Sequence, residues 1–583
     1  MPTPPPPRKP VVPASSGDNT DVLQILMFRK VLTRDQADRV RRHSRGNGMA
    51  VVDTIVKLGL ATEIQVGEAL AAFTGLRFVK INPLELDLDV VTGALSGPFA
   101  RKHGIVALAK TDEKLTVAVH DPFAEFPAED IKRVTGLLAI ERVISTRSDV
   151  ESINKNFYEL KSSLKTAEKQ LSARWIPTIE LGNQEYLSSE VDELDPAAAP
   201  VVKALDHLLG YAFEQRASDI HFEPKRTVTL VRLRIDGMLH DVHVIPKVVY
   251  QALVSRVKLL SGCNIAEKRR PQDGRIKRDQ NGREIELRVS TMPTAFGEKA
   301  VLRVFDPDVL LKGVDELGFS PIDVRKFREF LKRPHGIILV TGPTGSGKTT
   351  SLYSVLKHLS KPEVNIVTIE DPIEMVHEEF NQVAVRPAID LTFGAALRTV
   401  LRQDPDIIMV GEIRDRETAE YAVQAALTGH LVLSTLHTND APSSVTRLLD
   451  LGVPHFLVLS TVIGIVAQRL VRLNCRHCSE PYVPNDEEAT TLGMTVDALK
   501  SAKIRRGTGC LQCRQTGYAG RDGVFQVMPI SEQLRGLIAR QASSLALLEA
   551  ARGEGMRTLR EAAIEKVLEG VTTVSEMVRV TGG

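Results

Sequence analysis

The stretch Gly342-Pro343-Thr344-Gly345-Ser346-Gly347-Lys348-Thr349-Thr350 decides the fold of this chain, because it matches the G-x-x-x-x-G-K-[ST] pattern of a phosphate-binding loop. The apolar run 337–340 before it is typical of a buried strand, and 351–356 predict the first turns of a helix. Backbone N–H groups of the loop and the helix N-terminus can surround a polyphosphate. Lys348 would contact the β- and γ-phosphates, and the Thr349 hydroxyl would bind Mg²⁺. We therefore predict an ATP site at residues 342–350.

Length and composition describe a multidomain protein of ordinary composition. The 583 residues exceed one hydrophobic core, so we expect about three to five domains. A net charge of +2 gives no reason to expect a polyanionic partner. The longest apolar run, 456–471, is interrupted by polar residues and is interpreted as a core helix, too polar to span a membrane. The N-terminus lacks the apolar segment of a signal peptide, so we expect a cytosolic protein.

Composition also divides the chain into segments. Residues 1–20 are proline-rich and predict a disordered leader. In 21–160 the pattern is globular, with helices opened by Thr33 and Thr62 and a strand at 115–119. The charged, then alanine- and acid-rich segment 161–200 is interpreted as a linker. In 201–315 a helix near 204–209 and alternating apolar residues at 228–235 predict an α+β domain, and 316–583 contain the ATPase core, with a cysteine-bearing insert at 470–525 and a helical tail.

Two predicted strands of the core end in acidic residues. The run 365–369 leads into Glu370, and 407–410 leads through Gly411 into Glu412. Parallel α/β sheets gather their sites at the carboxyl ends of strands. We expect the strand before Glu412 to lie beside the phosphate-loop strand, so Glu412 is the favoured catalytic acid near Mg²⁺ and the γ-phosphate. Glu370 would approach from the other side and orient the attacking water.

His430 and His437 flank a third apolar run, 431–436. Their placement suggests that they sense a γ-phosphate. Satisfied polar histidines are the alternative, and the sequence leaves both interpretations open.

Four of the five cysteines form two C-x-x-C pairs, Cys475 with Cys478 and Cys510 with Cys513. Thiolates spaced in this way fit two corners of a tetrahedron, and two such turns close a structural Zn²⁺ site. A redox pair is the alternative. Cys263 stands alone and is expected to be buried.

The motifs together resemble the secretion ATPase superfamily. The segments 342–350, 368–374, 401–415 and 428–440 are similar to its Walker A, Asp box, Walker B and His box. The type II secretion ATPases and type IV pilus assembly ATPases are the most similar branches, with the wording of the boxes closer to the type II branch. The shorter pilus retraction ATPases lack both an N-terminal domain and a cysteine-bearing insert.

The resemblance implies a RecA-like P-loop NTPase core with a preceding α+β domain, a zinc-knuckle insert and an N-terminal α/β docking domain. It further implies a homohexamer that binds ATP between the core and the preceding domain. Developing charge on the transferred phosphoryl group needs additional cations. The arginines that match the family pattern, or are further candidates, are Arg288, Arg303, Arg398, Arg402 and Arg275.

The N-terminal domain departs from one pattern seen in relatives that bind cyclic di-GMP. Ala50 and Val52 stand where arginine and glycine belong, and Phe73 stands where glutamine belongs. We therefore do not expect cyclic di-GMP binding. The domain is expected to dock a recruiting protein at the inner membrane.

Three functions remain under consideration. The first is a cytoplasmic ATPase that drives assembly of a pseudopilus or pilus through an inner-membrane platform protein. The second is a nucleic-acid translocating motor, which the near-neutral charge and the lack of a stripe of basic and aromatic residues oppose. The third is a scaffold without turnover, which the presence of Lys348, Glu370 and Glu412 opposes. The sequence does not separate secretion from pilus assembly.

Overall fold

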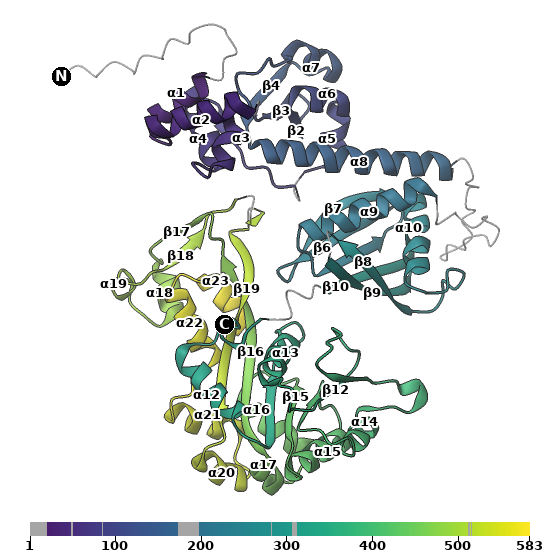
Figure 1. Cartoon of the computed structure of the whole chain (residues 1–583), viewed down its shortest axis with the longest axis vertical. Helices are drawn as coiled ribbons and strands as arrows, with labels where there is room; N and C mark the ends of the chain where they lie inside the picture. The colour runs from purple at the N-terminus through teal and green to yellow at the C-terminus, as the bar shows by residue number, and fades with distance from the viewer. Residues whose placement is uncertain are drawn as a thin grey trace.

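The computed structural model describes residues 20–47, 51–83, 86–172, 198–280, 283–305, 312–510, 513–514 and 516–582. The predicted leader, apart from Thr20, and Ala50 of the cyclic di-GMP comparison lie outside these residues. Figure 1 shows an N-terminal domain, a middle domain and a larger core domain arranged one after another.

The N-terminal domain places helices around a four-stranded sheet of order β1-β4-β3-β2. Its elements are α1 (Thr20–Phe28), α2 (Arg34–Asn47), α3 (Val51–Lys57), α4 (Glu63–Thr74), β1 (Arg77–Phe78), α5 (Leu88–Ala94), α6 (Gly97–His103), β2 (Ile105–Lys110), β3 (Lys114–Val119), α7 (Ala128–Thr135), β4 (Ala139–Ile144) and α8 (Arg147–Ser172). The predicted N-caps are confirmed: Thr33 and Thr62 each accept a hydrogen bond from the backbone N–H three residues later.

The predicted linker at 161–200 is wrong over its first part. Residues 161–172 continue α8, which runs alongside α9 (Ala199–Glu214) in Figure 1. Leu160, Leu164 and Ala167 are spaced along one face of α8, and they are buried in the hydrophobic core of the middle domain. Apolar residues at helical spacing therefore outweigh the charged composition of this segment. Residues 173–197 lie outside the described residues.

The middle domain is an antiparallel sheet of order β7-β6-β5-β10-β9-β8. Its other elements after α9 are β5 (Asp219–Pro224), β6 (Val228–Ile235), β7 (Met238–Pro246), α10 (Lys247–Leu260), β8 (Gln272–Gln280), β9 (Arg283–Thr294) and β10 (Gly297–Phe305). Buried and partly exposed residues alternate along β6, as its sequence predicts. Side chains from α9, α10 and one sheet face form a single core. The other face is left for polar side chains.

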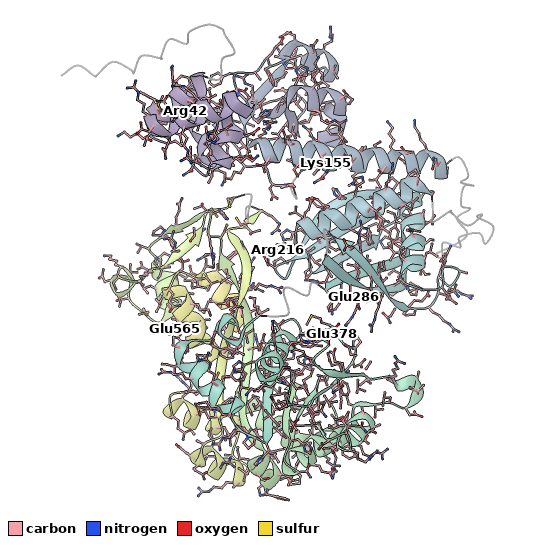
Figure 2. All side chains as sticks on the ribbon, in the orientation of Figure 1. Arg42, Lys155, Arg216, Glu286, Glu378 and Glu565 are labelled. Carbon is pink, nitrogen blue, oxygen red and sulfur yellow. The ribbon has the colours of Figure 1, made fainter. Side chains whose placement is uncertain are left out.

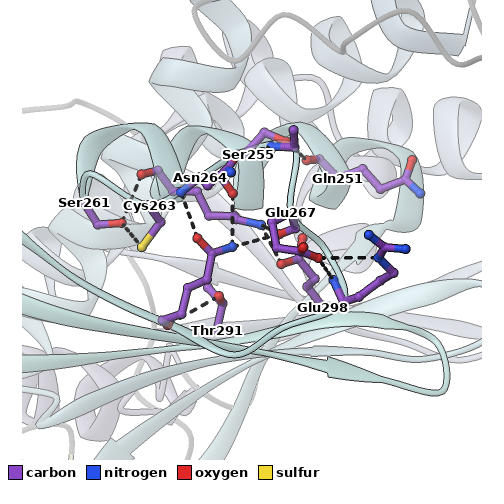
Figure 3. Close-up of polar contacts among 12 residues, drawn as sticks. Gln251, Ser255, Ser261, Cys263, Asn264, Glu267, Thr291 and Glu298 are labelled. Carbon is purple, nitrogen blue, oxygen red and sulfur yellow. Dashed lines mark hydrogen bonds and ion pairs between the residues drawn. The ribbon is translucent and has the colours of Figure 1, made fainter. Parts of the chain in front are cut away.

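A buried ion pair fixes the connection from α10 to β8 (Figure 3). Lys258 Nζ lies 2.7 Å from Glu298 Oε1 and donates to the Glu267 carbonyl at 2.6 Å. The Gln272 amide donates to the carbonyls of Asn264 and Glu267 at 3.0 and 2.8 Å. These bonds anchor the loop that begins β8, and they thereby set the register of Arg275 against the neighbouring strand.

The core is a seven-stranded sheet of order β13-β12-β14-β15-β11-β16-β19, parallel except for the antiparallel pair β16–β19. Its elements are η1 (Val314–Glu316), α12 (Pro321–Leu331), β11 (Gly336–Thr341), α13 (Lys348–Leu359), β12 (Ile366–Glu370), β13 (Asn381–Ala384), η2 (Pro387–Ile389), α14 (Phe393–Val400), β14 (Ile407–Val410), α15 (Arg416–Leu427), β15 (Leu431–Leu436), α16 (Ala441–Asp450), α17 (His455–Thr461), β16 (Val462–Asn474) and β19 (Tyr518–Pro529). Hydrophobic clusters on both faces bury the central strands, as parallel sheets require.

The cysteine-bearing insert lies between β16 and β19, and a helical tail follows β19. The insert contains β17 (Ser479–Pro481), α18 (Asp486–Leu492), α19 (Val496–Leu499) and β18 (Arg505–Gly507), and the tail contains α20 (Glu532–Ala539), α21 (Ser544–Gly553), α22 (Leu559–Leu568) and α23 (Val574–Thr581). Both lie beside the core sheet. The insert is shorter than the predicted 470–525, because residues 470–474 belong to β16 and 518–525 belong to β19.

The prediction of one core helix over 456–471 is wrong. The helix α17 ends at Thr461, and the rest of the run forms β16, which lies between β11 and β19. Val462, Ile463, Ile465 and Val466 are β-branched, and such side chains favour a central strand. Among the described residues, no helix has the length and apolar character needed to cross a membrane.

Candidate functional site

The phosphate loop joins β11 to α13, as predicted. Gly345 and Gly347 adopt φ values of 78° and 87°, a left-handed conformation that glycine adopts without strain. Lys348 Nζ donates to the carbonyls of Gly342 and Pro343 at 2.8 and 3.2 Å, so its ammonium group lies against the loop. Burial lowers the pKa of Lys348 below its ordinary value, and the charge of Glu412 opposes that shift.

Glu412 lies at the carboxyl edge of the core sheet, two residues after β14. Its carboxylate pairs with Arg414 at 2.5 Å and with His437 at 3.3 Å, and its side chain is only 12% exposed. The prediction that the strand before Glu412 lies beside the phosphate-loop strand is wrong. The strand β15 lies between β14 and the phosphate-loop strand β11. The negative charge of Glu412 nevertheless acts on the pKa of Lys348.

Glu370 occupies a different position from the one predicted. It is 4% exposed, and both carboxylate oxygens accept hydrogen bonds. The donors are Tyr353 Oη at 2.7 Å, Thr368 Oγ1 at 2.6 Å and Gln382 Nε2 at 3.1 Å. Three protein donors therefore hold this buried carboxylate within the core. Its contacts instead join α13, through Tyr353, to strands β12 and β13.

Glu374 is a residue that the sequence analysis missed as a site residue. It follows Glu370 by four positions, and the side chain of Thr349 in the phosphate loop lowers the pKa of its carboxyl. Burial raises the pKa of Glu374, and the positive charge of Arg288 opposes that effect. The sequence shows two glutamates in 368–374, and the structure shows that only the second lies beyond the end of β12.

Arginines from three neighbouring strands of the middle domain lie in one row. Arg275, Arg288 and Arg303 are register partners across β8, β9 and β10. Like charges placed opposite each other destabilise a sheet, so such a row is expected where an anion binds. Arg288 is 17% exposed, stacks on Phe305 at 4.2 Å and donates to the carbonyl of Ile373 in the core. Burial lowers its pKa.

The Arg288 contact connects the middle domain to the Asp-box loop that contains Glu374. Figure 2 shows Glu286, which pairs with Arg275 and Arg288 at 3.7 and 3.9 Å, at the border where the middle domain faces Glu378 of the core. Arg303 is more exposed and pairs with Asp219 at 3.0 Å. The predicted site between the two domains thus contains Arg288, Glu374 and the phosphate loop.

The structure does not bring Arg398 and Arg402 to this site within one chain. Both are exposed, in the last turn of α14 and just after it. Arg402 Nη1 donates to the Arg398 carbonyl at 3.2 Å. These residues precede β14, whereas Glu412 follows it, so the strand separates the arginines from that glutamate.

The two histidines lie at opposite edges of the core sheet. His437 follows β15 and pairs with Glu412 at 3.3 Å. His430 precedes β15, its Nδ1 lies 2.9 Å from the Ala425 carbonyl, and its own carbonyl accepts from Gly336 at the start of β11. A six-residue strand spans roughly 20 Å. The prediction that both histidines sense one γ-phosphate is therefore wrong for His430 within a single chain.

The four predicted zinc ligands form one cluster. Their sulfur atoms all lie within 4.8 Å of one another. Three sulfur pairs, Cys475 with Cys510, Cys478 with Cys513 and Cys510 with Cys513, are 3.6, 3.7 and 3.7 Å apart. Metal–sulfur bonds of about 2.3 Å in a tetrahedron place sulfur atoms about 3.8 Å apart. Backbone N–H groups of Cys510 and Gly517 donate to Cys513 Sγ. The cluster fits a structural Zn²⁺ ion.

The sheet order, the phosphate loop and the acids at the carboxyl edge define a P-loop ATPase. Residues 195–579 match the family described as Type II/IV secretion system protein, and residues 74–164 match the MshEN domain. The chain therefore belongs to the type II/IV secretion system protein family, which confirms the predicted resemblance, the RecA-like fold and ATP hydrolysis by a motor of this family.

Relatives from both branches match over most of the chain. The Acinetobacter baylyi type IV pilus assembly ATPase TfpB is 43% identical, and the match covers 89% of this chain and 88% of that protein. The type II secretion system protein E of Xanthomonas campestris pv. campestris is 38% identical over 96% of this chain and 98% of its own length. A solved structure of the pilus retraction motor PilT with ADP is 26% identical, with a TM-score of 0.45, covering 64% of this chain and 96% of that one. The preference for the type II branch stays a prediction.

Proposed function

We propose that this chain forms a hexameric ATPase that drives assembly of a pseudopilus or pilus, and that it hydrolyses ATP where the core meets the middle domain. The observation that best supports this proposal is the contact between Arg288 of β9 and the Ile373 carbonyl, next to Glu374. This contact makes the position of the middle domain sensitive to the Asp-box loop, and Glu374 of that loop has a carboxyl whose pKa Thr349 of the phosphate loop lowers. Chemistry in the core can therefore move the middle domain.

Each residue of the site then has a defined task. The loop 342–350 holds the phosphates, Lys348 binds the β- and γ-phosphates, and Thr349 and the neighbouring carboxylates hold Mg²⁺. The metal ion neutralises phosphate charge when it is bound. Glu374 and Glu412 hold the attacking water and take up its proton, and His437 keeps Glu412 oriented. Glu370 has a structural task, because its hydrogen bonds join α13 to β12 and β13. Arg288 and Arg303 stabilise charge that develops on the transferred group.

The hexamer gives a place to residues that the single chain leaves away from the site. Arg398, Arg402 and His430 lie toward the amino edge of the core sheet, where a neighbouring subunit could use them. Binding of one Zn²⁺ by the four cysteines completes the insert. We place the motor in the cytoplasm, at the inner membrane through a platform protein and a recruiting protein that bind the N-terminal domain. The prediction that cyclic di-GMP does not bind stays untested.

Stimulation of ATP hydrolysis tests the proposal. Purified full-length protein is assayed alone, with the cytoplasmic domain of the platform protein, and with double- or single-stranded DNA, and its mass is measured by light scattering. We expect a hexamer stimulated by the platform domain and indifferent to DNA, with Lys348→Ala as the inactive control. Stimulation by DNA alone would instead support the nucleic-acid motor.

A further inference from the structure

The strand β16 runs beside the phosphate-loop strand, and it continues past the end of that strand. Thr341, the last residue of β11, is the register partner of Ala467. The next residues of β16, Gln468 and Arg469, therefore lie alongside the phosphate loop itself. They are two of the polar residues that interrupt the apolar run 456–471.

Gln468 uses its whole amide group on the two ends of the phosphate loop. Its Nε2 donates to the Ser346 carbonyl at 2.6 Å, and its Oε1 accepts from Ser351 Oγ at 2.8 Å. The side chain is 1% exposed, so no solvent competes for these bonds. Ser346 precedes Lys348 and Ser351 follows it. One buried amide thus fixes both sides of the segment that binds phosphate.

Arg469 contacts a second loop of the site. Its Nη2 donates to the Asn439 carbonyl at 3.0 Å and to Asn439 Oδ1 at 3.3 Å, and its Nη1 donates to the Gln468 carbonyl at 3.1 Å. Asn439 follows His437, the partner of Glu412, by two residues. The fit beneath the phosphate loop is tight, because a Cβ on Gly342 would lie 2.6 Å from the Gln468 carbonyl and 3.2 Å from Arg469 Nη1.

We infer that Gln468 and Arg469 are positioning residues for ATP hydrolysis, and that each positions a different loop of the site. Gln468 keeps the phosphate loop in its binding conformation, so its loss weakens nucleotide affinity. Arg469 holds the 437–440 loop against the phosphate loop, so its loss misplaces His437 and Glu412 and lowers kcat. The inference rests on the nucleotide site of the proposed function.

Full-length variants test this division. For Gln468→Met, which keeps size and removes both hydrogen bonds, we expect ADP affinity to fall about 10-fold or more by calorimetry, because the buried Ser346 carbonyl is left unpaired. For Arg469→Met we expect kcat to fall about 10-fold or more, with ADP affinity within about twofold of wild type. Arg469→Lys should recover part of kcat, because a lysine can still reach the Asn439 carbonyl.

A matched control comes from the neighbouring strand. Gln526 is the register partner of Ala467, is 2% exposed and accepts from the Ala441 N–H at 3.0 Å. Gln526→Met also removes a buried amide, and it should leave ADP affinity within about twofold. The inference is overturned if Gln468→Met binds ADP as wild type does, if Arg469→Met keeps a normal kcat, or if Gln526→Met weakens ADP binding as much as Gln468→Met. Failure of the proposed function is distinct, because it is measured on wild-type protein, as ATP hydrolysis that DNA stimulates and the platform domain does not.

Discussion

The core sheet and the middle sheet present their charged residues in different ways. In the mostly parallel core sheet, Glu412 and His437 lie in loops at the carboxyl edge of the strands, and Lys348 begins the helix α13 that follows one of them. In the antiparallel middle sheet, Arg275, Arg288 and Arg303 lie within strands, in a row across one face. Parallel strands buried on both faces leave only their ends for chemistry, whereas an antiparallel sheet covered on one side has a free face.

This difference explains how the two halves of a site can move. A site built only at the edge of one sheet is rigid with that sheet. Here the contact from Arg288 to the Ile373 carbonyl adds charge from a second body. Under the proposed function, a rigid-body motion of the middle sheet would add or remove this charge at the core edge. The predictions below test each half, beginning with the largest effect.

Lys348→Ala changes only the core half of the site, and it should abolish ATP hydrolysis. The side chain contacts loop carbonyls and no hydrophobic core, so we expect the fold to remain intact. Without its charge on the phosphates, kcat/KM should fall at least about 1,000-fold. Steady-state phosphate release measures the activity, and circular dichroism checks the fold. Wild-type turnover in the variant would contradict the assignment.

Substitutions of the three glutamates at the carboxyl edge of the core sheet should have different effects on turnover, according to their positions. We expect Glu412→Gln and Glu374→Gln to bind ATP and turn over about 100-fold more slowly, the usual scale for a lost acid–base or water-positioning group. Glu370→Gln should lose less than about 10-fold, because its buried carboxylate holds Tyr353 and Gln382. Single-turnover rates and ATP affinity are the measurements. Near-normal turnover of Glu374→Gln beside a dead Glu370→Gln would reverse the assignment.

The core half was largely predictable because its motifs are local. Lys348 and Thr349 lie in one continuous pattern, and Glu412 follows its own strand after a single glycine. The prediction for His430 failed because a whole strand lies between it and His437. The sequence pattern places the two histidines close together along the chain, although the two ends of the strand are far apart in space. Glu374 was missed because both glutamates of 368–374 appear equivalent until the end of β12 is known.

The middle half was less predictable because it depends on register. Arg288 and Arg303 were found through a family resemblance, and nothing local showed that they share a row with Arg275. That row exists only once three strands are paired in one particular register. The 456–471 run was misinterpreted for a similar reason: its neighbours in the sheet, β11 and β19, are distant in sequence.

Arg288→Ala tests the middle half. We expect kcat to fall about 10- to 100-fold, the effect of losing a cation that acts on developing charge. Arg278 offers a matched control on the other face of the same sheet, where it pairs with Asp206 of α9 at 2.6 Å. Arg278→Ala should change kcat by less than about twofold. Equal losses in both variants would mean that the arginine face has no special role.

Zinc removal tests whether the insert supports the junction of the two halves. We expect about one Zn²⁺ per chain by elemental analysis, lost in Cys475→Ser and retained in Cys263→Ser. Arg514, next to Cys513, donates to Gln215 Oε1 of the middle domain at 3.0 Å, and its carbonyl accepts from Asn82 of the N-terminal domain. Without metal-binding energy this loop should unfold locally, which proteolysis of the insert would detect. Freshly reduced wild-type protein that contains no zinc would refute the site.

The last prediction concerns the helix-covered face of the middle sheet, opposite the arginine row. His243 of β7 is 5% exposed and packs against Phe157 of α8 and Tyr211 of α9, with ring centroids 5.8 and 5.5 Å away. Burial lowers its pKa to about 4, from the ordinary value of 6.5. The unfolded chain therefore binds a proton before the folded chain does. Stability is fully present above about pH 6.5 and is lost as pH falls toward 4, by up to about 3 kcal/mol.

A comparison of two leucine variants isolates this contribution. His243→Leu removes the titrating group and should flatten the pH dependence of unfolding between pH 7.5 and 5, whereas His335→Leu, at an exposed position of the core, should leave it as in wild type. Urea midpoints at the two pH values, read by pulse-labelling hydrogen exchange in α8 and α9, give the measurement. Because His243 contacts α8 of the N-terminal domain, its protonation should loosen that helix from the middle sheet while the arginine face keeps its register. An unchanged pH dependence in His243→Leu would place the acid sensitivity elsewhere.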